Sequence, residues 1–248
     1  MLETVLWMTA LAGVGGTGAG GILTCGLRRD GERTISLLLS FAAGVMLAVV
    51  CGDLLTDALS QRSGVFGLGL TVGGVLMGYG LIGLLNRITA REQPEQRKGL
   101  FWAGVVMAAA IALHNLPEGM VIGASFARGT GTGGLAMAVV IGLHNIPEGL
   151  AVAVPFAYAT RRRTAGVLAA LVSGLAEPLG AVLAWLFLRR LFTPGFLNGT
   201  VVLAAGVMVW VALAQLLPGA LHPAHRTAGI LGATVGCLLM LLGIAALP

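Results

Sequence analysis

The chain has 248 residues, of which 57% are hydrophobic and only 10% are charged, and its mean hydropathy is +0.93. Soluble domains carry about 25% charged residues, so this composition excludes an ordinary soluble domain and predicts an integral membrane protein. The formal net charge of +5 would suit a nucleic-acid partner. The distribution of the basic residues, described below, instead indicates membrane topology.

Eight apolar stretches divide the chain, each close to the ~20 residues that a membrane-spanning helix needs. We predict spans at residues 5–26, 37–59, 65–85, 100–126, 135–158, 167–188, 199–221 and 229–247. Helices are expected because each span has to satisfy its own backbone hydrogen bonds, and no stretch alternates in the way of a barrel strand. The connections are short, so we expect an all-α protein with one transmembrane domain covering residues 1–248.

Charged residues indicate both the orientation and a polar interior. All 15 Lys and Arg residues fall in loops, and eleven of them follow the first, third, fifth and seventh spans. By the positive-inside rule these four loops are cytoplasmic, and both termini are extracellular or periplasmic. Five of the ten acidic residues instead lie within spans, where no Lys or Arg accompanies them: Asp53, Asp57, Glu118, Glu148 and Glu177. Carboxylates at membrane depth require protons or a cation.

The fourth and fifth spans carry nearly the same seven residues. Leu113–Gly119 reads L-H-N-L-P-E-G, and Leu143–Gly149, 30 residues later, reads L-H-N-I-P-E-G. His and Glu four apart and Asn and Glu three apart share a helix face. The candidate metal ligands are His114, Asn115, Glu118, His144, Asn145 and Glu148. Imidazole and carboxylate together suit Zn²⁺ and other divalent first-row metals, and duplication on antiparallel neighbours favours a metal site over a structural polar pair.

A second repeat lies in the outer spans. Ala42–Leu59 and Ala204–Leu221 share the pattern A-A-G-V-M at a constant offset of 162 residues. These are the second and seventh spans, which run in opposite directions. Both repeats predict one pseudo-two-fold axis in the membrane plane and a 3+2+3 grouping of the spans. Inverted repeats of this kind are characteristic of alternating-access transporters.

Five further residues are candidates for a role in metal handling. Glu177, before Pro178 in the sixth span, is a further metal ligand or proton acceptor, or else a protonated, packed acid. Asp53 and Asp57 could attract cations at an entrance, or simply mark a water-exposed helix end. His222 and His225 belong to a solvated cytoplasmic loop or to a transient exit site.

Several enzyme and nucleotide motifs fail or are missing. Gly13–Gly18 matches G-x-G-x-x-G, but it lies inside a span and follows no strand, so we interpret it as small-residue helix packing. The sequence contains neither a Walker A motif nor H-E-x-x-H. We therefore expect no nucleotide cofactor, no ATP-driven transport and no enzyme, and give little weight to an intramembrane zinc protease.

The eight spans, the paired HNxPEG motifs and the S-G-x-x-E-P sequence of the sixth span resemble the ZIP (Zrt/Irt-like) metal transporters, and among them the bacterial GufA/ZupT-like branch. The resemblance implies a 3+2+3 bundle with a binuclear metal centre between the fourth and fifth spans. It also implies an elevator-like motion of spans one, four, five and six against the other four. One metal position would use His114, Glu118, His144 and Glu148. The other would use Asn115, Glu118, Asn145, Glu148 and Glu177.

Three positions depart from the family pattern. The loop Asn86–Gly99 has no histidine where many relatives have a His-rich loop. Gln215 stands where relatives often carry an acid. Asn145 stands where some relatives have Asp, so the second metal position is expected to hold less negative charge and to bind more weakly.

From these observations we expect a multi-pass protein of the cell (inner or plasma) membrane that imports divalent metal ions into the cytoplasm. Zinc is the foremost expected substrate, and Cd²⁺, Fe²⁺, Mn²⁺ and Co²⁺ accept similar ligands. A selective divalent-metal channel and, less favoured, an intramembrane metalloenzyme are the alternatives. The expected partners are the metal ions and the lipid bilayer, with a homodimer allowed for and no nucleic acid.

Overall fold

A computed structural model describes residues 2–26, 32–54, 96–127, 131–187 and 205–246, together with isolated positions between 69 and 87 and position 202. Within these residues the chain is helical apart from short connections, and no strand is present. The all-α prediction is therefore confirmed for the described part of the chain.

The first two predicted spans are helices with local irregularities. The first consists of α1 (Leu2–Ala10), a π-helical turn η1 (Leu11–Gly15), α2 (Gly16–Leu23) and a 3-10 turn η2 (Thr24–Gly26). The second consists of α3 (Glu32–Val49) and a π-helical turn η3 (Val50–Leu54). Their glycine-rich and alanine-rich sequences allow close packing against neighbouring helices.

The middle of the chain forms two long helices and one broken helix. The long ones are α6 (Gln96–Ala127) and α7 (Gly131–Thr160), which continue through their internal prolines. The next span divides at Leu175 into α8 (Arg163–Gly174) and α9 (Ala176–Phe187). Pro178 has no N–H to donate to the carbonyl of Gly174, which explains a break at this point.

The last part of the chain completes the bundle. An apolar helix covers Ala205–Ala214 and overlaps the π-helical turn η4 (Val211–Leu216), which leads into α11 (Leu217–Ala220). A short 3-10 turn η5 (Pro223–His225) then connects to α12 (Arg226–Ala246). Both π-helical turns, η3 and η4, fall in the repeat of the outer spans, where the offset of 162 places residues 50–54 over residues 212–216.

Six of the described helices are long and apolar enough to cross a membrane: Leu2–Gly26, Arg33–Gly52, Gly104–Gly123, Ala138–Thr160, Arg163–Leu186 and Pro223–Ala245. With the shorter apolar helix Ala205–Ala214 they correspond to seven of the eight predicted spans. The remaining one, 65–85, lies largely outside the described residues. The protein is therefore an α-helical integral membrane protein.

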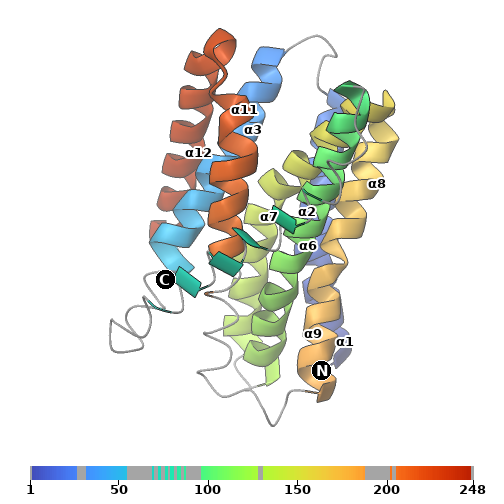
Figure 1. Cartoon of the computed structure of the whole chain (residues 1–248). Helices are drawn as coiled ribbons and strands as arrows, with labels where there is room; N and C mark the ends of the chain where they lie inside the picture. Colours follow the sequence, from blue (N-terminus) through green and yellow to red (C-terminus); the bar gives the residue numbers. More distant parts are fainter. Residues whose placement is uncertain are drawn as a thin grey trace.

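The described helices form two groups that stand side by side (Figure 1). One group contains α3, α11 and α12, and the other contains α1, α2 and α6–α9. The two chain termini lie at the same end of the bundle. Between the groups is an apolar core to which α3 contributes Met46, α6 contributes Ile111, α7 contributes Val152, and the helix after position 205 contributes Met208.

Glycines bring pairs of helices into backbone contact around the two HNxPEG motifs. A Cβ added to Gly119 of α6 would overlap the carbonyl of Glu177 in α9, and one added to Gly149 of α7 would overlap the carbonyl of Thr17 in α2. In return, Gly180 of α9 meets the carbonyl of Leu116, and Gly20 of α2 meets that of Ile146. The α6–α9 and α7–α2 pairs thus use matching contacts, as a pseudo-two-fold axis requires.

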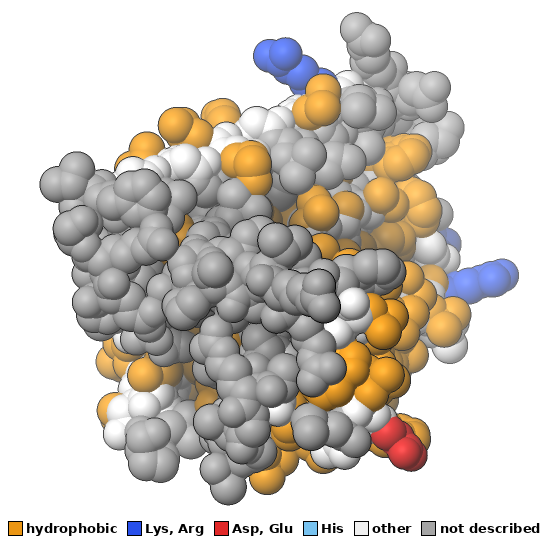
Figure 2. Space-filling model, turned by 90° about the horizontal axis from the view of Figure 1, so that it is seen from below, with side chains coloured by type: hydrophobic (Ala, Val, Ile, Leu, Met, Phe, Trp, Pro, Cys, Tyr) orange, Lys and Arg blue, Asp and Glu red, His pale blue; other side chains and the backbone are white. Residues whose placement is uncertain are grey.

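The outer surface of the bundle suits a lipid environment. Described side chains around the edge of the molecule, seen from below, are mostly hydrophobic (Figure 2). Large apolar side chains such as Trp7, Leu143 and Leu242 are more than half exposed. Such residues on a water-soluble protein would form aggregation-prone patches, whereas in a bilayer they contact acyl chains.

Candidate metal centre

The polar interior of the bundle gathers the seven residues singled out in the middle three spans. Helices α6, α7 and α9 position them, and none is more than 7% exposed: His114, Asn115, Glu118, His144, Asn145, Glu148 and Glu177. The three- and four-residue spacings predicted that the His, Asn and Glu of each motif share one helix face. The convergence of these side chains agrees with that prediction. The buried polar residues of the described chain include no Lys or Arg, so these carboxylates have no cationic side chain beside them.

Imidazole and carboxylate groups from the two motifs meet across the α6–α7 interface. His114 Nε2 lies 3.1 Å from Glu118 Oε1 and 3.4 Å from Glu148 Oε1. His144 Nε2 lies 3.0 Å from the same Glu118 oxygen. One ligand atom each from His114, His144 and Glu148 falls within 4.8 Å of the others. Nitrogen and oxygen atoms converging in this way match the donor set of a divalent metal.

The two asparagines have different partners. Asn145 Nδ2 donates to Glu177 Oε2 at 2.7 Å and to the backbone carbonyl of Ala12 in η1 at 3.0 Å. The amide of Asn115, oriented so that its nitrogen meets acceptors, donates to Glu148 Oε2 at 3.2 Å and to the carbonyl of Ile111 in its own helix at 3.1 Å. Both amides thus orient a carboxylate, but only Asn145 also contacts the first span.

Several acceptor atoms in the centre are buried without a hydrogen-bond partner. They include Glu118 Oε2, Asn145 Oδ1, Glu148 Oε1 and Glu177 Oε1. A buried acceptor that lacks a partner costs free energy of about 1–3 kcal/mol, more for a charged group. A cation bound among these oxygens would remove that cost, so the chemistry of the donor set fits a divalent ion.

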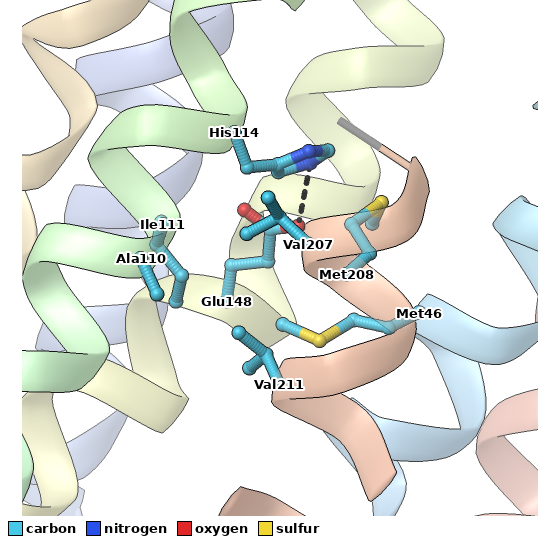
Figure 3. A pocket seen from close by; sticks show the side chains of 8 residues that line it. All are labelled: Met46, Ala110, Ile111, His114, Glu148, Val207, Met208 and Val211. Atoms are coloured by element: carbon cyan, nitrogen blue, oxygen red, sulfur yellow. Dashed lines mark ion pairs between the residues drawn. The ribbon is translucent and has the colours of Figure 1, made fainter. Parts of the chain in front are cut away.

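One side of the centre is closed by an apolar wall. Met46 of α3 and Val207, Met208 and Val211 of the seventh span face His114 and Glu148 across a pocket that leaves no room for a water molecule (Figure 3). The sequence did not single out the two methionines. They occupy equivalent positions in the A-A-G-V-M repeat, which is the signal that could have identified them.

The remaining predicted residues lie away from this centre or outside the described chain. The backbone of Asp53 belongs to η3, but its side chain and all of Asp57 lie outside the described residues. His222 caps η5, with its ring Nδ1 accepting from the backbone N–H of Ala224 at 3.4 Å, and His225 ends the same turn. The structure therefore places these two histidines in the α11–α12 connection and not at the centre.

This chain is similar both to a protein family and to individual known proteins. A family model described as "ZIP Zinc transporter" matches residues 88–244. A protein named zinc transporter ZupT from Chlorobium luteolum is 35% identical over 98% of this chain and 97% of its own length. Proteins of the same name from Corynebacterium efficiens and Escherichia coli are each 34% identical, covering 94% and 88% of this chain and 93% and 86% of their own lengths.

The family match covers more than half of the chain, and the similarity to the curated relatives extends over nearly all of it. Residues 88–244, which the family model matches, include both HNxPEG motifs and the Glu177-Pro178 dipeptide. The chain therefore belongs to the ZIP zinc transporter family.

Proposed function

We propose that this protein imports divalent metal ions into the cytoplasm, with zinc as the principal substrate. Its family is one of membrane transporters and not of enzymes. The observation that best supports the proposal is the meeting of two imidazoles and two carboxylates, from two antiparallel helices, in the interior of a membrane bundle. Two carboxylates with no buried Lys or Arg nearby balance the charge of one divalent ion.

The proposed ligands divide into two neighbouring positions. The first uses His114, Glu118, His144 and Glu148. The second uses Asn115, Asn145 and Glu177, with Glu118 and Glu148 bridging the two. An entering ion exchanges its water for these nitrogen and oxygen donors, which explains why a cation that has lost its hydration shell is stable at this depth. His222 and His225 are proposed only as an exit site. Asp53 and Asp57 are proposed only as an entrance.

The proposed topology is eight spans in a 3+2+3 arrangement, forming one transmembrane transporter domain with both termini outside the cytoplasm. Its support comes from the helix directions: α3 ends near the end of the bundle where the C-terminus lies, and α6 begins at the opposite end (Figure 1). One further span, at residues 65–85, would connect them. The matching contacts of α6–α9 and α7–α2 support the inverted repeat.

The proposed mechanism is an elevator-like exchange between outward-facing and inward-facing states. The moving group would comprise α1, α2 and α6–α9, and the other group would contain α3, α11 and α12. The surface between them is apolar and includes small residues such as Ala42, Ala110 and Ala151, which suits sliding. The wall of Met46 and Met208 closes one side of the centre in the described state.

Reconstitution in proteoliposomes tests this proposal. Purified full-length protein should carry Zn²⁺ inward without ATP, at a rate that saturates with concentration, and Cd²⁺, Fe²⁺, Mn²⁺ and Co²⁺ should compete to different extents. Single-channel currents would instead establish a selective channel. Light scattering of the detergent-solubilised protein tests a homodimer, and no nucleotide should stimulate uptake.

A further inference from the structure

The first span carries no Asp, Glu, His, Lys or Arg between residues 5 and 26, yet it reaches the metal centre with its backbone. The carbonyl of Ala12 accepts a hydrogen bond from Asn145 Nδ2 at 3.0 Å, across 133 residues of sequence. Ala12 lies in the π-helical turn η1 and is 3% exposed. A π-helical turn shifts the backbone out of regular register, and such turns occur frequently at functional sites.

This contact fixes which way the amide of Asn145 points. Its nitrogen already donates to Ala12 and to Glu177 Oε2, at 3.0 and 2.7 Å. Rotating the amide would set its oxygen against two acceptors, so that orientation is excluded. The oxygen Oδ1 is therefore held away from both acceptors. It and Glu177 Oε1 are buried without a hydrogen-bond partner, as two oxygens available to a cation.

Two glycines of the same span make room for these side chains. A Cβ on Gly13 would overlap the backbone carbonyl of Gly174 and would lie 2.7 Å from Glu177 Cβ and 2.9 Å from Glu177 Oε2. A Cβ on Gly16 would overlap the backbone carbonyl of Gly142 and would lie 2.7 Å from Asn145 Cβ. All of these separations are shorter than real Cβ atoms adopt, so a side chain at either position would require the facing backbone and a proposed ligand of the second metal position to move.

Two other glycines of the span pack tightly without touching the centre. A Cβ on Gly20 would overlap the carbonyl of Ile146 and approach Leu150 N to 2.7 Å, and one on Gly18 would lie 2.6 Å from Leu171 Cδ2. Substitutions at these two positions perturb the same span and its packing against α7 and α8, but the added Cβ reaches neither Asn145 nor Glu177. They are therefore matched controls for Gly13 and Gly16.

We propose that the first span determines whether the centre holds a second metal ion. The Ala12 carbonyl, with the space left by Gly13 and Gly16, positions Asn145 and Glu177 so that their free oxygens bind that ion. This inference rests on the proposed metal centre. Ala12, Gly13 and Gly16 are positioning residues, since they act through the two side chains and not on the ion itself.

Zinc stoichiometry of the purified full-length protein tests the inference, with Zn²⁺ alone as the probe. Equilibrium dialysis followed by elemental analysis should give two ions per wild-type chain. In Gly13→Ala and Gly16→Ala the weaker affinity should fall at least about tenfold, in the range seen for supporting residues of metal sites, while the tighter affinity stays unchanged. Gly20→Ala and Gly18→Ala should keep both ions even where their thermal stability is lower.

Three results would overturn the inference: one ion in the wild type, two ions of unchanged affinity in Gly13→Ala and Gly16→Ala, or a loss of the second ion in Gly20→Ala equal to that in Gly13→Ala. Zinc is measured only in the monodisperse fraction of each variant. If either Gly13→Ala or Gly16→Ala does not fold, the other variant carries the test. The proposed function fails by a different result, namely a tight ion that persists when Glu118 is replaced by Gln.

Discussion

The HNxPEG motif of α6 and its copy in α7 differ by one apolar residue in sequence but have different surroundings. In α6 the amide of Asn115 stays with its own helix, at the carbonyl of Ile111, and with Glu148 of the facing motif. In α7 the amide of Asn145 leaves the pair of helices and contacts Ala12 and Glu177. Of the two asparagine amides, only that of the second copy therefore hydrogen-bonds to the first and sixth spans.

The backbones around the two motifs are nevertheless related by matching contacts. Gly119 lies against the carbonyl of Glu177, and Gly149 lies against the carbonyl of Thr17, so Thr17 stands where the pseudo-symmetry would place a partner of Glu177. The Thr17 hydroxyl donates to the carbonyl of Gly13 in its own helix at 2.8 Å. The framework is thus nearly two-fold symmetric, whereas the third carboxylate exists on one side only. A duplicated scaffold can in this way carry an asymmetric ligand set.

The largest expected effect comes from the two glutamates of the motifs. Glu118→Gln and Glu148→Gln keep the side-chain volume but remove the charge that balances the ion. We expect each to lower the initial rate of zinc uptake in proteoliposomes by more than about 100-fold, beyond the range typical of residues that only support metal ligands. Protein content of the vesicles is the control. Uptake within threefold of wild type in either variant would contradict the site assignment.

The two histidines should differ, because their contacts do. His114 forms ion pairs with both Glu118 and Glu148, whereas among the described residues His144 forms one with Glu118 alone. We expect His114→Ala to weaken zinc binding by roughly 100-fold and His144→Ala by roughly 10-fold, since each removes a ligand but the first also frees two carboxylates to repel each other. Calorimetric titration with Zn²⁺ measures both. Equal losses would show that the copies contribute equivalently.

Acidification should weaken zinc binding. Imidazole must be neutral and carboxylate ionised to bind a metal, so protons compete with zinc and affinity falls as pH falls. Between about pH 7.5 and about pH 5.5 we expect the apparent affinity of the wild type to fall at least roughly tenfold. His144→Gln should flatten the profile by removing one competing site. A profile that is independent of pH in the wild type would exclude an imidazole-containing site.

The smallest effect on transport distinguishes Glu177 from Thr17. Glu177→Gln should reduce zinc uptake several-fold and weaken only the second ion, because Glu177 contacts Asn145 and not the histidines. Thr17→Val removes a hydroxyl that bonds only within its own helix, so it should lower the free energy of unfolding by about 1 kcal/mol and leave zinc binding unchanged. Thermal denaturation and dialysis measure the two quantities. A change in zinc affinity in Thr17→Val would contradict the claim that Thr17, unlike Glu177, does not contribute to the metal centre.

Polar residues in apolar spans were the part of the site that the sequence could predict. His114, Glu118 and Glu177 stand out because each is costly to bury in hydrocarbon, and the helical spacing places those of one motif on one face. The contribution of Ala12 could not be predicted, because a backbone carbonyl has no side-chain signal. Gly13 and Gly16 were correctly interpreted as packing residues, but which helices they meet depends on tertiary structure.

For the fold, the sequence predicted the helices and one break, but not the local irregularity of the first span. Apolar length and the absence of strand patterns gave the helices, and Pro178 marks the break at Leu175. The π-helical turn at Leu11–Gly15 contains no proline and has no such marker. The span at residues 65–85 and the 3+2+3 grouping stay predictions.

Anomalous diffraction at the zinc absorption edge, from crystals of the wild-type protein grown with Zn²⁺, tests the shared metal centre most directly. We predict a strong peak between α6 and α7, at about 2.0–2.2 Å from His114 Nε2 and from oxygens of Glu118 and Glu148. A second, weaker peak should lie next to Asn145 and Glu177. Zinc peaks only in the His222–His225 connection, or none between the two motifs, would contradict a single centre built from both copies.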